Sequence, residues 1–101
     1  MAFSKSPLNS ETYQQRMRRK LTEKLAPALL EIKDDSTKHV GHAGHNPLGE
    51  THFTIKIISH TFDGLTRVQR HQLVYSIVAE EMAERVHALS LSTSSPNEHN
   101  H

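Results

Sequence analysis

Apolar residues recur at intervals of four near the start of the chain, and residues four apart lie on one face of an α-helix. The positions are Tyr13, Met17, Leu21 and Leu25. Ser10 is suited to cap the N-terminus of this helix, and Pro27 ends it. The pattern therefore predicts a helix whose apolar stripe packs into a core.

Three later segments have strand-like patterns. Residues 30–34 and 52–57 alternate apolar and polar positions, as half-buried strands do. Residues 86–91 form a third predicted strand, in which His87 shares one face with Leu89 and Leu91.

A second helix is predicted between the last two strands. Thr66 and Gln69 have the spacing of a capping box at its start. Its buried stripe is expected to contain Val74, Ile77, Val78 and Met82. Glycines and a proline indicate that residues 36–49 form a loop, and a loop of this length in a small domain is usually functional or disordered.

The predicted order is helix, strand, loop, strand, helix, strand, which indicates an α+β sandwich. The first two strands are expected to pair antiparallel. The second and third are joined through a helix, so they could pair in parallel. A chain of 101 residues is expected to form one domain.

Composition adds limits on function and location. The formal charge of +1 lacks the strong field of a dedicated nucleic-acid binder. The absence of cysteine, of a signal-peptide pattern and of a long apolar run predicts a cytoplasmic protein with no membrane segment. We expect a flexible N-terminus over 1–9 and a flexible C-terminal tail over 94–101.

Nine histidines are the chemical hallmark of the chain, and His39, His42 and His45 recur at every third residue of one glycine-rich stretch. Neutral imidazole is the commonest metal ligand in proteins. These residues could equally be solvated histidines with incidental metal affinity. A zinc hydrolase with Glu50 as base is disfavoured, because a glycine-rich loop is a poor scaffold for catalysis. We expect no enzyme activity.

Five short motifs along the chain together resemble the BolA family. They are Gly49-Glu50-Thr51-His52-Phe53, Phe62-Asp63-Gly64-Leu65, Arg70-His71-Gln72-Leu73-Val74-Tyr75, Ala79-Glu80-Glu81-Met82 and Val86-His87-Ala88-Leu89. The resemblance covers residues 10–93 and implies a class II KH-like α-β-β-α-α-β sandwich. Its three-stranded mixed sheet would carry the helices on one face. One helix of this order, a short helical turn near residues 62–65, is absent from the order that the apolar pattern predicts.

The resemblance also implies partners and a cofactor. Members of the family act with monothiol glutaredoxins as a heterodimer, and share a [2Fe–2S] cluster with the glutaredoxin and glutathione. They serve in iron–sulfur cluster maturation or transfer, or in iron regulation. By itself the protein would be a monomer or weak homodimer without a stable cluster. Some members are described as transcriptional regulators that bind DNA.

The resemblance places one cluster ligand on His87 and a second in the loop, with His39 ranked first, His42 second and His45 third. Because this chain lacks cysteine, any thiolate must come from the partner. Imidazole must be neutral to bind metal, so metal binding should weaken in mild acid. The sequence gives His52 only a surface position, His71 a structural or partner-contact role, and His60 no role.

Nucleic-acid binding is the alternative function. Phosphates could be contacted by Arg16, Arg19, Lys20, Arg67 and Arg70. Gly41-His42-Ala43-Gly44 has the Gly-x-x-Gly form of the KH loop, but it lies between two predicted strands, whereas the KH loop joins two helices. A solvated, charged helix face would explain the same basic cluster.

Overall fold

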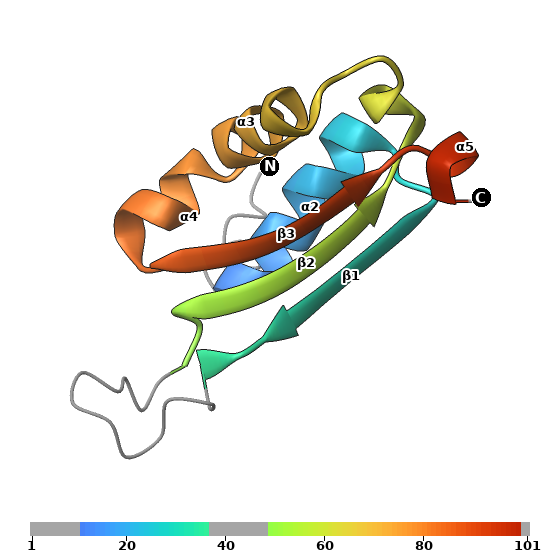
Figure 1. Ribbon diagram of the computed structural model, residues 1–101. Coiled ribbons are helices and arrows are strands. Elements are labelled where there is room, and N and C mark those ends of the chain that lie inside the picture. Colours follow the sequence, from blue (N-terminus) through green and yellow to red (C-terminus); the bar gives the residue numbers. More distant parts are fainter. Residues whose placement is uncertain (1–10, 37–48, 100–101) are drawn as a thin grey trace, which may run out of the picture.

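The computed structural model describes residues 11–36 and 49–99 of the chain, and its elements are labelled in Figure 1. They are helix α2 (Tyr13–Leu25), strand β1 (Leu29–Asp34), strand β2 (His52–Ile58), the 3-10 helix η2 (His60–Phe62), helix α3 (Arg67–Ile77), helix α4 (Ala79–Glu84), strand β3 (Ala88–Ser94) and helix α5 (Pro96–His99).

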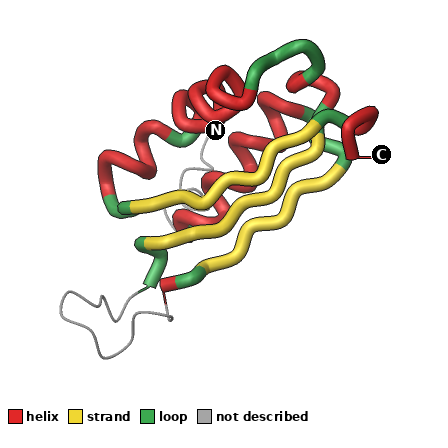
Figure 2. The backbone as a smooth tube through the Cα atoms, in the orientation of Figure 1, coloured by secondary structure: helices red, strands yellow, loops and turns green. Residues whose placement is uncertain are grey.

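The strands form one mixed sheet in the order β1-β2-β3. β1 pairs antiparallel with β2, with Ile32 opposite Ile55, and β2 pairs parallel with β3, with Phe53 opposite Leu89. Helices α2, α3 and α4 pack on one face of this sheet (Figures 1 and 2). The predicted α+β class and both predicted strand orientations are confirmed.

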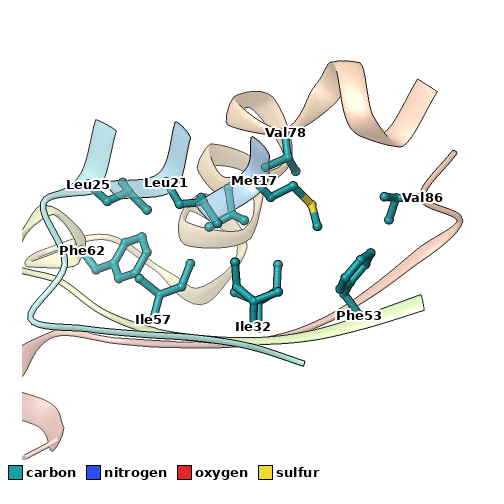
Figure 3. Close-up of a cluster of buried hydrophobic side chains, with 11 residues drawn as sticks. Met17, Leu21, Leu25, Ile32, Phe53, Ile57, Phe62, Val78 and Val86 are labelled. Atoms are coloured by element: carbon teal, nitrogen blue, oxygen red, sulfur yellow. The ribbon is translucent and has the colours of Figure 1, made fainter. Parts of the chain in front are cut away.

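The core lies between this sheet face and the helices (Figure 3). From α2 it receives Met17, Leu21 and Leu25, as the four-residue spacing predicted. Phe53, Ile55 and Ile57 enter from alternate positions of β2, and the helix stripe contributes Val74 and Val78. Tyr13, Ile77 and Met82 pack against this cluster while partly buried. Alternation along β2 puts His52, Thr54 and Lys56 on the opposite face of the sheet.

The cap of the first helix differs from the prediction. Thr12 is the N-cap: its hydroxyl accepts a hydrogen bond from the Gln15 N–H at 3.0 Å, and the Gln15 side chain accepts one from the Thr12 N–H at 2.9 Å. Ser10 lies outside the described residues. The capping box of Thr66 and Gln69 is confirmed at the start of α3.

The second predicted helix is broken into two at Val78, whose φ of −106° and ψ of 24° depart from helical values. The break orients α4 so that Glu81 contacts basic side chains of α2. Apolar spacing does not encode that charge pairing, so the pattern predicted one continuous helix. The short turn expected near residues 62–65 is found slightly earlier, as η2.

The last strand begins and ends later than predicted. It starts at Ala88, so His87 precedes it, and it continues to Ser94 before α5. The expected boundary at residue 93 falls within this strand. The end of β3 is rich in serine and threonine, so it lacks the apolar alternation that predicts a strand. Helix α5 is held by a residue distant in the sequence, because the Glu98 carboxylate lies 2.6 Å from each terminal nitrogen of Arg70.

Candidate functional site

One carboxylate holds both ends of the connection between β1 and β2. Asp34 accepts hydrogen bonds from the Ser36 N–H at 2.8 Å and from the Glu50 N–H at 3.1 Å. Gly49 has a φ of +73°, and a Cβ there would lie 3.3 Å from Asp34 Oδ2, so a glycine suits this position. The two ends of the connection are therefore held next to each other.

Other side chains also hold the base of the connection, by which we mean its two ends at Ser36 and Glu50. The buried Ser36 hydroxyl accepts hydrogen bonds from the Thr51 N–H at 2.8 Å and the His52 N–H at 3.2 Å. Arg85, directly after α4, donates to the Gly49 carbonyl from Nε at 3.0 Å and from Nη2 at 2.6 Å. The start of β2 is thereby fixed to the end of β1 and to the helical layer.

His87 lies at this same end of the sheet, where β2 and β3 both begin (Figure 1). Its backbone N–H donates to the Thr51 carbonyl at 2.7 Å, and the preceding Val86 is buried. Its side chain is exposed, and the imidazole makes no hydrogen bond to any described residue. An accessible imidazole is therefore held on a rigid backbone support.

The predicted partners of His87 follow Ser36 in the sequence. His39 is three residues beyond Ser36, a distance that an extended chain spans in at most about 11 Å. His39, His42 and His45 themselves lie outside the described residues. The fold thus brings the base of the histidine-rich connection beside His87, and which of these histidines approaches it stays a prediction.

His52 is a site residue that sequence reasoning missed. Its ring centroid lies 6.2 Å from that of His87, with the ring planes tilted by 53°. Its Nδ1 lies 2.9 Å from the Thr51 hydroxyl. The register of the parallel pair would have revealed it, because His52 lies opposite Ala88, the residue after His87.

The donor set defines what this end can bind. In the described part of the chain, no three His, Asp or Glu side chains gather as potential metal ligands. The whole chain contains no cysteine. Imidazoles are the ligands that this end offers, and any sulfur ligand of a bound metal must come from another molecule.

The basic residues proposed for nucleic acid are mostly paired within the chain. Arg16 contacts the fully buried Glu81 at 2.9 Å and Glu84 at 3.0 Å. Lys20 contacts Glu80 at 2.7 Å and the same Glu81 at 2.8 Å. The hydrogen bond from Arg16 to Glu84 raises the pKa of the guanidinium and lowers that of the carboxyl.

The remaining three basic residues differ in whether they form ion pairs within the chain. Arg19 pairs with Glu11 at 3.0 Å. Arg70 is largely buried, and its bidentate hydrogen bond lowers the pKa of Glu98 to about 2. Arg67 is exposed and makes no ion pair with a described residue. Four of the five cations are thus already neutralised by carboxylates of the same chain.

Two more histidines of the described ranges, His71 and His60, lie elsewhere. His71 is partly buried and lines a groove of about 310 Å³ between α3 and β3. The groove is lined by Arg67, Arg70, His71, Leu91, Ser92 and Thr93. His60 is exposed, and its Nδ1 lies 3.1 Å from a carboxylate oxygen of Asp63. Neither imidazole joins the pair at His87.

The arrangement is that of a small α+β domain with an imidazole-bearing end, and comparison with known proteins defines it further. The family model described as BolA-like protein matches residues 21–98. The BolA domain of SufE1 from Arabidopsis thaliana is similar in structure, with a TM-score of 0.78 and 40% identity over 87% of this chain and 96% of that chain. The chain belongs to the BolA family.

Two curated relatives show how far the similarity extends. Protein BOLA1, chloroplastic, from Arabidopsis thaliana is 46% identical over 82% of this chain and 53% of that protein. The DNA-binding transcriptional regulator BolA from Escherichia coli (strain K12) is 38% identical over 78% of this chain and 71% of that protein. The chain spans about half the length of the first of these relatives.

In the part of the chain that the structure describes, no helix has the length and apolar character to cross a bilayer. One relative is named as chloroplastic. A cytoplasmic location therefore stays a prediction for this chain.

Proposed function

We propose that this protein is a non-enzymatic adaptor that binds a monothiol glutaredoxin and co-ligates a [2Fe–2S] cluster through histidines. The observation that carries the proposal is the exposed imidazole of His87, a residue whose backbone N–H donates to the Thr51 carbonyl beside the base of the histidine-rich connection. Membership of the BolA family is consistent with this role.

The chemistry of the donor set determines how the ligands are divided. His87 supplies one imidazole, and the connection supplies a second, with His39 ranked ahead of His42 and His45. Two histidines on one iron give a Rieske-like arrangement, which raises the reduction potential of a cluster. The remaining ligands are a glutaredoxin cysteine and glutathione, so the protein alone would hold no stable cluster.

The shape of the site favours ligand exchange over catalysis. An exposed imidazole at the end of a sheet can face a partner surface, whereas a catalytic metal needs a shaped pocket that excludes water. We infer a role in cluster maturation or transfer, or in iron regulation, with the heterodimer as the active form.

Co-expression with a monothiol glutaredoxin tests the proposal. We expect the purified heterodimer to show the visible absorption and circular dichroism of a [2Fe–2S] cluster, and His87→Ala to change or abolish these spectra. His60→Ala is the matched control, because His60 is also exposed but contacts Asp63. Single alanine variants of His39, His42 and His45 identify the second ligand.

Two outcomes would contradict the proposal. An unchanged spectrum for the His87→Ala heterodimer would exclude His87 as a ligand. Failure of the protein to associate with any monothiol glutaredoxin, with or without a cluster, would exclude the adaptor role itself.

A second candidate function is regulation of transcription through DNA binding. The observations that favour it are the name of the Escherichia coli relative and the exposed Arg67, which lines the groove between α3 and β3 and makes no ion pair with a described residue. The internal pairing of the other cations weakens it. If DNA is bound through phosphates, affinity will fall steeply with added salt, and Arg67→Ala will reduce that slope by about one unit.

A further inference from the structure

The groove between α3 and β3 lies at the side of the sheet where β3 forms the edge (Figure 1). Residues of α3 form one wall, and residues 91–93 of β3 form the other. Its volume of about 310 Å³ is at the lower end of the range of about 300–1,000 Å³ that small-molecule sites occupy. The groove therefore has room for a small ligand.

Two side chains of the α3 wall are not paired with any carboxylate of the described residues. Arg67 is exposed and makes no ion pair there, and His71 makes no hydrogen bond there. They are four residues apart, so they are neighbours on one face of the helix. Both line the groove, and both carry N–H donors.

Arg70 has a different part in the same wall. Its Nε donates to the Leu65 carbonyl at 3.0 Å, and its Nη1 donates to the Thr93 carbonyl at 3.4 Å. Both terminal nitrogens also bond the Glu98 carboxylate, at 2.6 Å each. These contacts occupy most of the donors of the guanidinium and offset its charge. Arg70 therefore fixes the wall, while Arg67 and His71 are available to a ligand.

The strand wall is the free edge of β3. At both ends of the strand, backbone groups bond towards β2: the Ala88 N–H donates to the Thr51 carbonyl at 3.2 Å, and the Ser94 carbonyl accepts from the Ser59 N–H at 3.0 Å. Backbone groups of alternate residues point to opposite sides of a strand. The N–H and C=O groups of residues 89, 91 and 93 therefore face the open edge.

Donors outnumber acceptors at this edge. Two of its carbonyls are contacted from α3, since Arg70 reaches that of Thr93 and the Tyr75 hydroxyl lies 3.5 Å from that of Leu89. The carbonyl of Leu91 remains as an acceptor. The N–H groups of Leu91 and Thr93 make no hydrogen bond to a side chain in the described ranges. Together with the α3 wall, they favour a ligand that accepts hydrogen bonds and carries negative charge.

We propose that this groove binds the phosphate group of a small phosphate monoester. The guanidinium of Arg67 pairs with two phosphate oxygens, as arginine does in bidentate recognition. A ring N–H of His71 and the N–H groups at the edge of β3 bond the remaining acceptor positions. A phosphate suits this donor set better than a carboxylate, because it has three strong acceptor oxygens.

The distribution of charge favours a small ligand over a nucleic-acid backbone. Binding to a duplex neutralises several phosphates along its length, each with a cation of the protein. Among the five basic residues considered for that role, Arg67 alone makes no ion pair with a described residue. A monoester concentrates a charge of about −1.5 to −2 on one group, so a single site suffices. No residue of the groove is a proposed cluster ligand, so this inference does not depend on the glutaredoxin partner.

The inference is tested by titrating sn-glycerol 3-phosphate into the full ¹⁵N-labelled chain, at an ionic strength held constant with chloride. We expect the amides of Leu91 and Thr93 and the ring of His71 to shift along one saturable binding curve in NMR spectra, with the ring of His60 unchanged. Glycerol and acetate are the control ligands and should not produce these shifts. Equal shifts with acetate would overturn the assignment to phosphate.

A pair of variants separates the groove from general attraction to a cation. A hydrogen bond to a charged group is worth roughly tenfold or more in affinity, so Arg67→Gln should weaken binding by at least that factor. Arg18→Gln is the matched control, because Arg18 is also exposed and contacts the Leu30 carbonyl, in β1, at 3.4 Å. It should bind as the unmodified protein does. Unchanged binding by Arg67→Gln, or equal weakening in both variants, would show that the inference is wrong.

A short DNA duplex, compared at equal phosphate concentration, distinguishes the two sources of phosphate. If the duplex shifts the groove amides and glycerol 3-phosphate does not, the small-ligand inference is wrong and the second candidate function is supported. If glycerol 3-phosphate binds but no glutaredoxin associates, the adaptor role fails and the phosphate site stands. If the heterodimer forms with its cluster but glycerol 3-phosphate causes no shift, the phosphate site fails and the adaptor role stands.

Discussion

Two groups of ionisable side chains lie on either side of the junction between α4 and β3, and they differ in how their polar atoms are used. The first is the α2–α4 ion network, made of Arg16, Lys20, Glu80, Glu81 and Glu84. The second is the histidine pair, His52 and His87. Val86 joins them, since its N–H donates to the Glu81 carbonyl and His87 follows it.

The members of the network pair with one another because they carry opposite charges. The carboxylate of Glu81 is fully buried between two cations, which a solitary buried carboxylate could not tolerate. Two imidazoles lack this complementarity of charge, because neither can carry a negative charge to match a positive one. The difference separates a group that stabilises the fold from one suited to bind a ligand.

The largest effect is expected in the network. Removing one partner of a buried ion pair typically costs about 3–5 kcal/mol, and the lower end applies here because Arg16 and Lys20 keep other partners. Glu81→Gln should therefore lower the free energy of unfolding by about 3 kcal/mol in urea denaturation at pH 7.

Glu80→Gln provides the matched control for this measurement. Glu80 also contacts Lys20, but its side chain is 72% exposed, so the expected loss is below about 1 kcal/mol. Equal losses for Glu80→Gln and Glu81→Gln would show that burial of the network contributes nothing.

An intermediate effect is expected at another ion pair within the chain, that of Arg70 with Glu98. Hydrogen bonds from Arg70 lower the pKa of Glu98 from 4.5 to about 2. A depressed pKa means that the pair stabilises the fold above about pH 4.5 and loses this contribution as the pH falls towards 2.

Thermal unfolding across this pH range measures that contribution. The melting temperature of Glu98→Gln should lie below that of the unmodified protein at pH 7, and the two should converge near pH 2. Because the Glu98 side chain is half exposed, added salt should narrow the gap. A gap that is constant from pH 7 to pH 2 would refute the pairing.

The smallest effect is expected at the histidine pair. His87 is exposed and makes no side-chain hydrogen bond to a described residue, so His87→Ala should change the free energy of unfolding by no more than about 0.5 kcal/mol in metal-free buffer. A loss comparable to that of Glu81→Gln would make His87 a structural residue and remove the contrast between the two groups.

The sequence predicted the fold where periodicity alone determines it. The stripe from Met17 to Leu25, the alternation in β2 and the capping box at Thr66 are local patterns, and each is confirmed. The resemblance to the BolA family is confirmed as membership. His87 lies beside the base of the connection, and its role as a ligand stays a prediction.

The sequence is least informative where distant residues decide the structure. It offers the cations of α2 as a candidate phosphate-binding set, whereas the structure pairs Lys20 and Arg16 with carboxylates 60 and 68 residues away in the sequence. The residues of α5 have the composition of a polar tail, and the anchor of Glu98, Arg70, lies 28 residues earlier. His52 was overlooked because strand register, which alternation does not specify, sets its distance from His87.

The Asp34 carboxylate has a consequence for how this chain tolerates change. Because it binds both ends of the connection, the two strands stay joined whatever number of residues lies between Ser36 and Glu50. Each doubling of loop length costs only about 0.6 kcal/mol in closure entropy. Insertions here would change the spacing of His39, His42 and His45 while the rest of the domain is preserved, so this is the place where new sequences can be introduced at little cost to the fold.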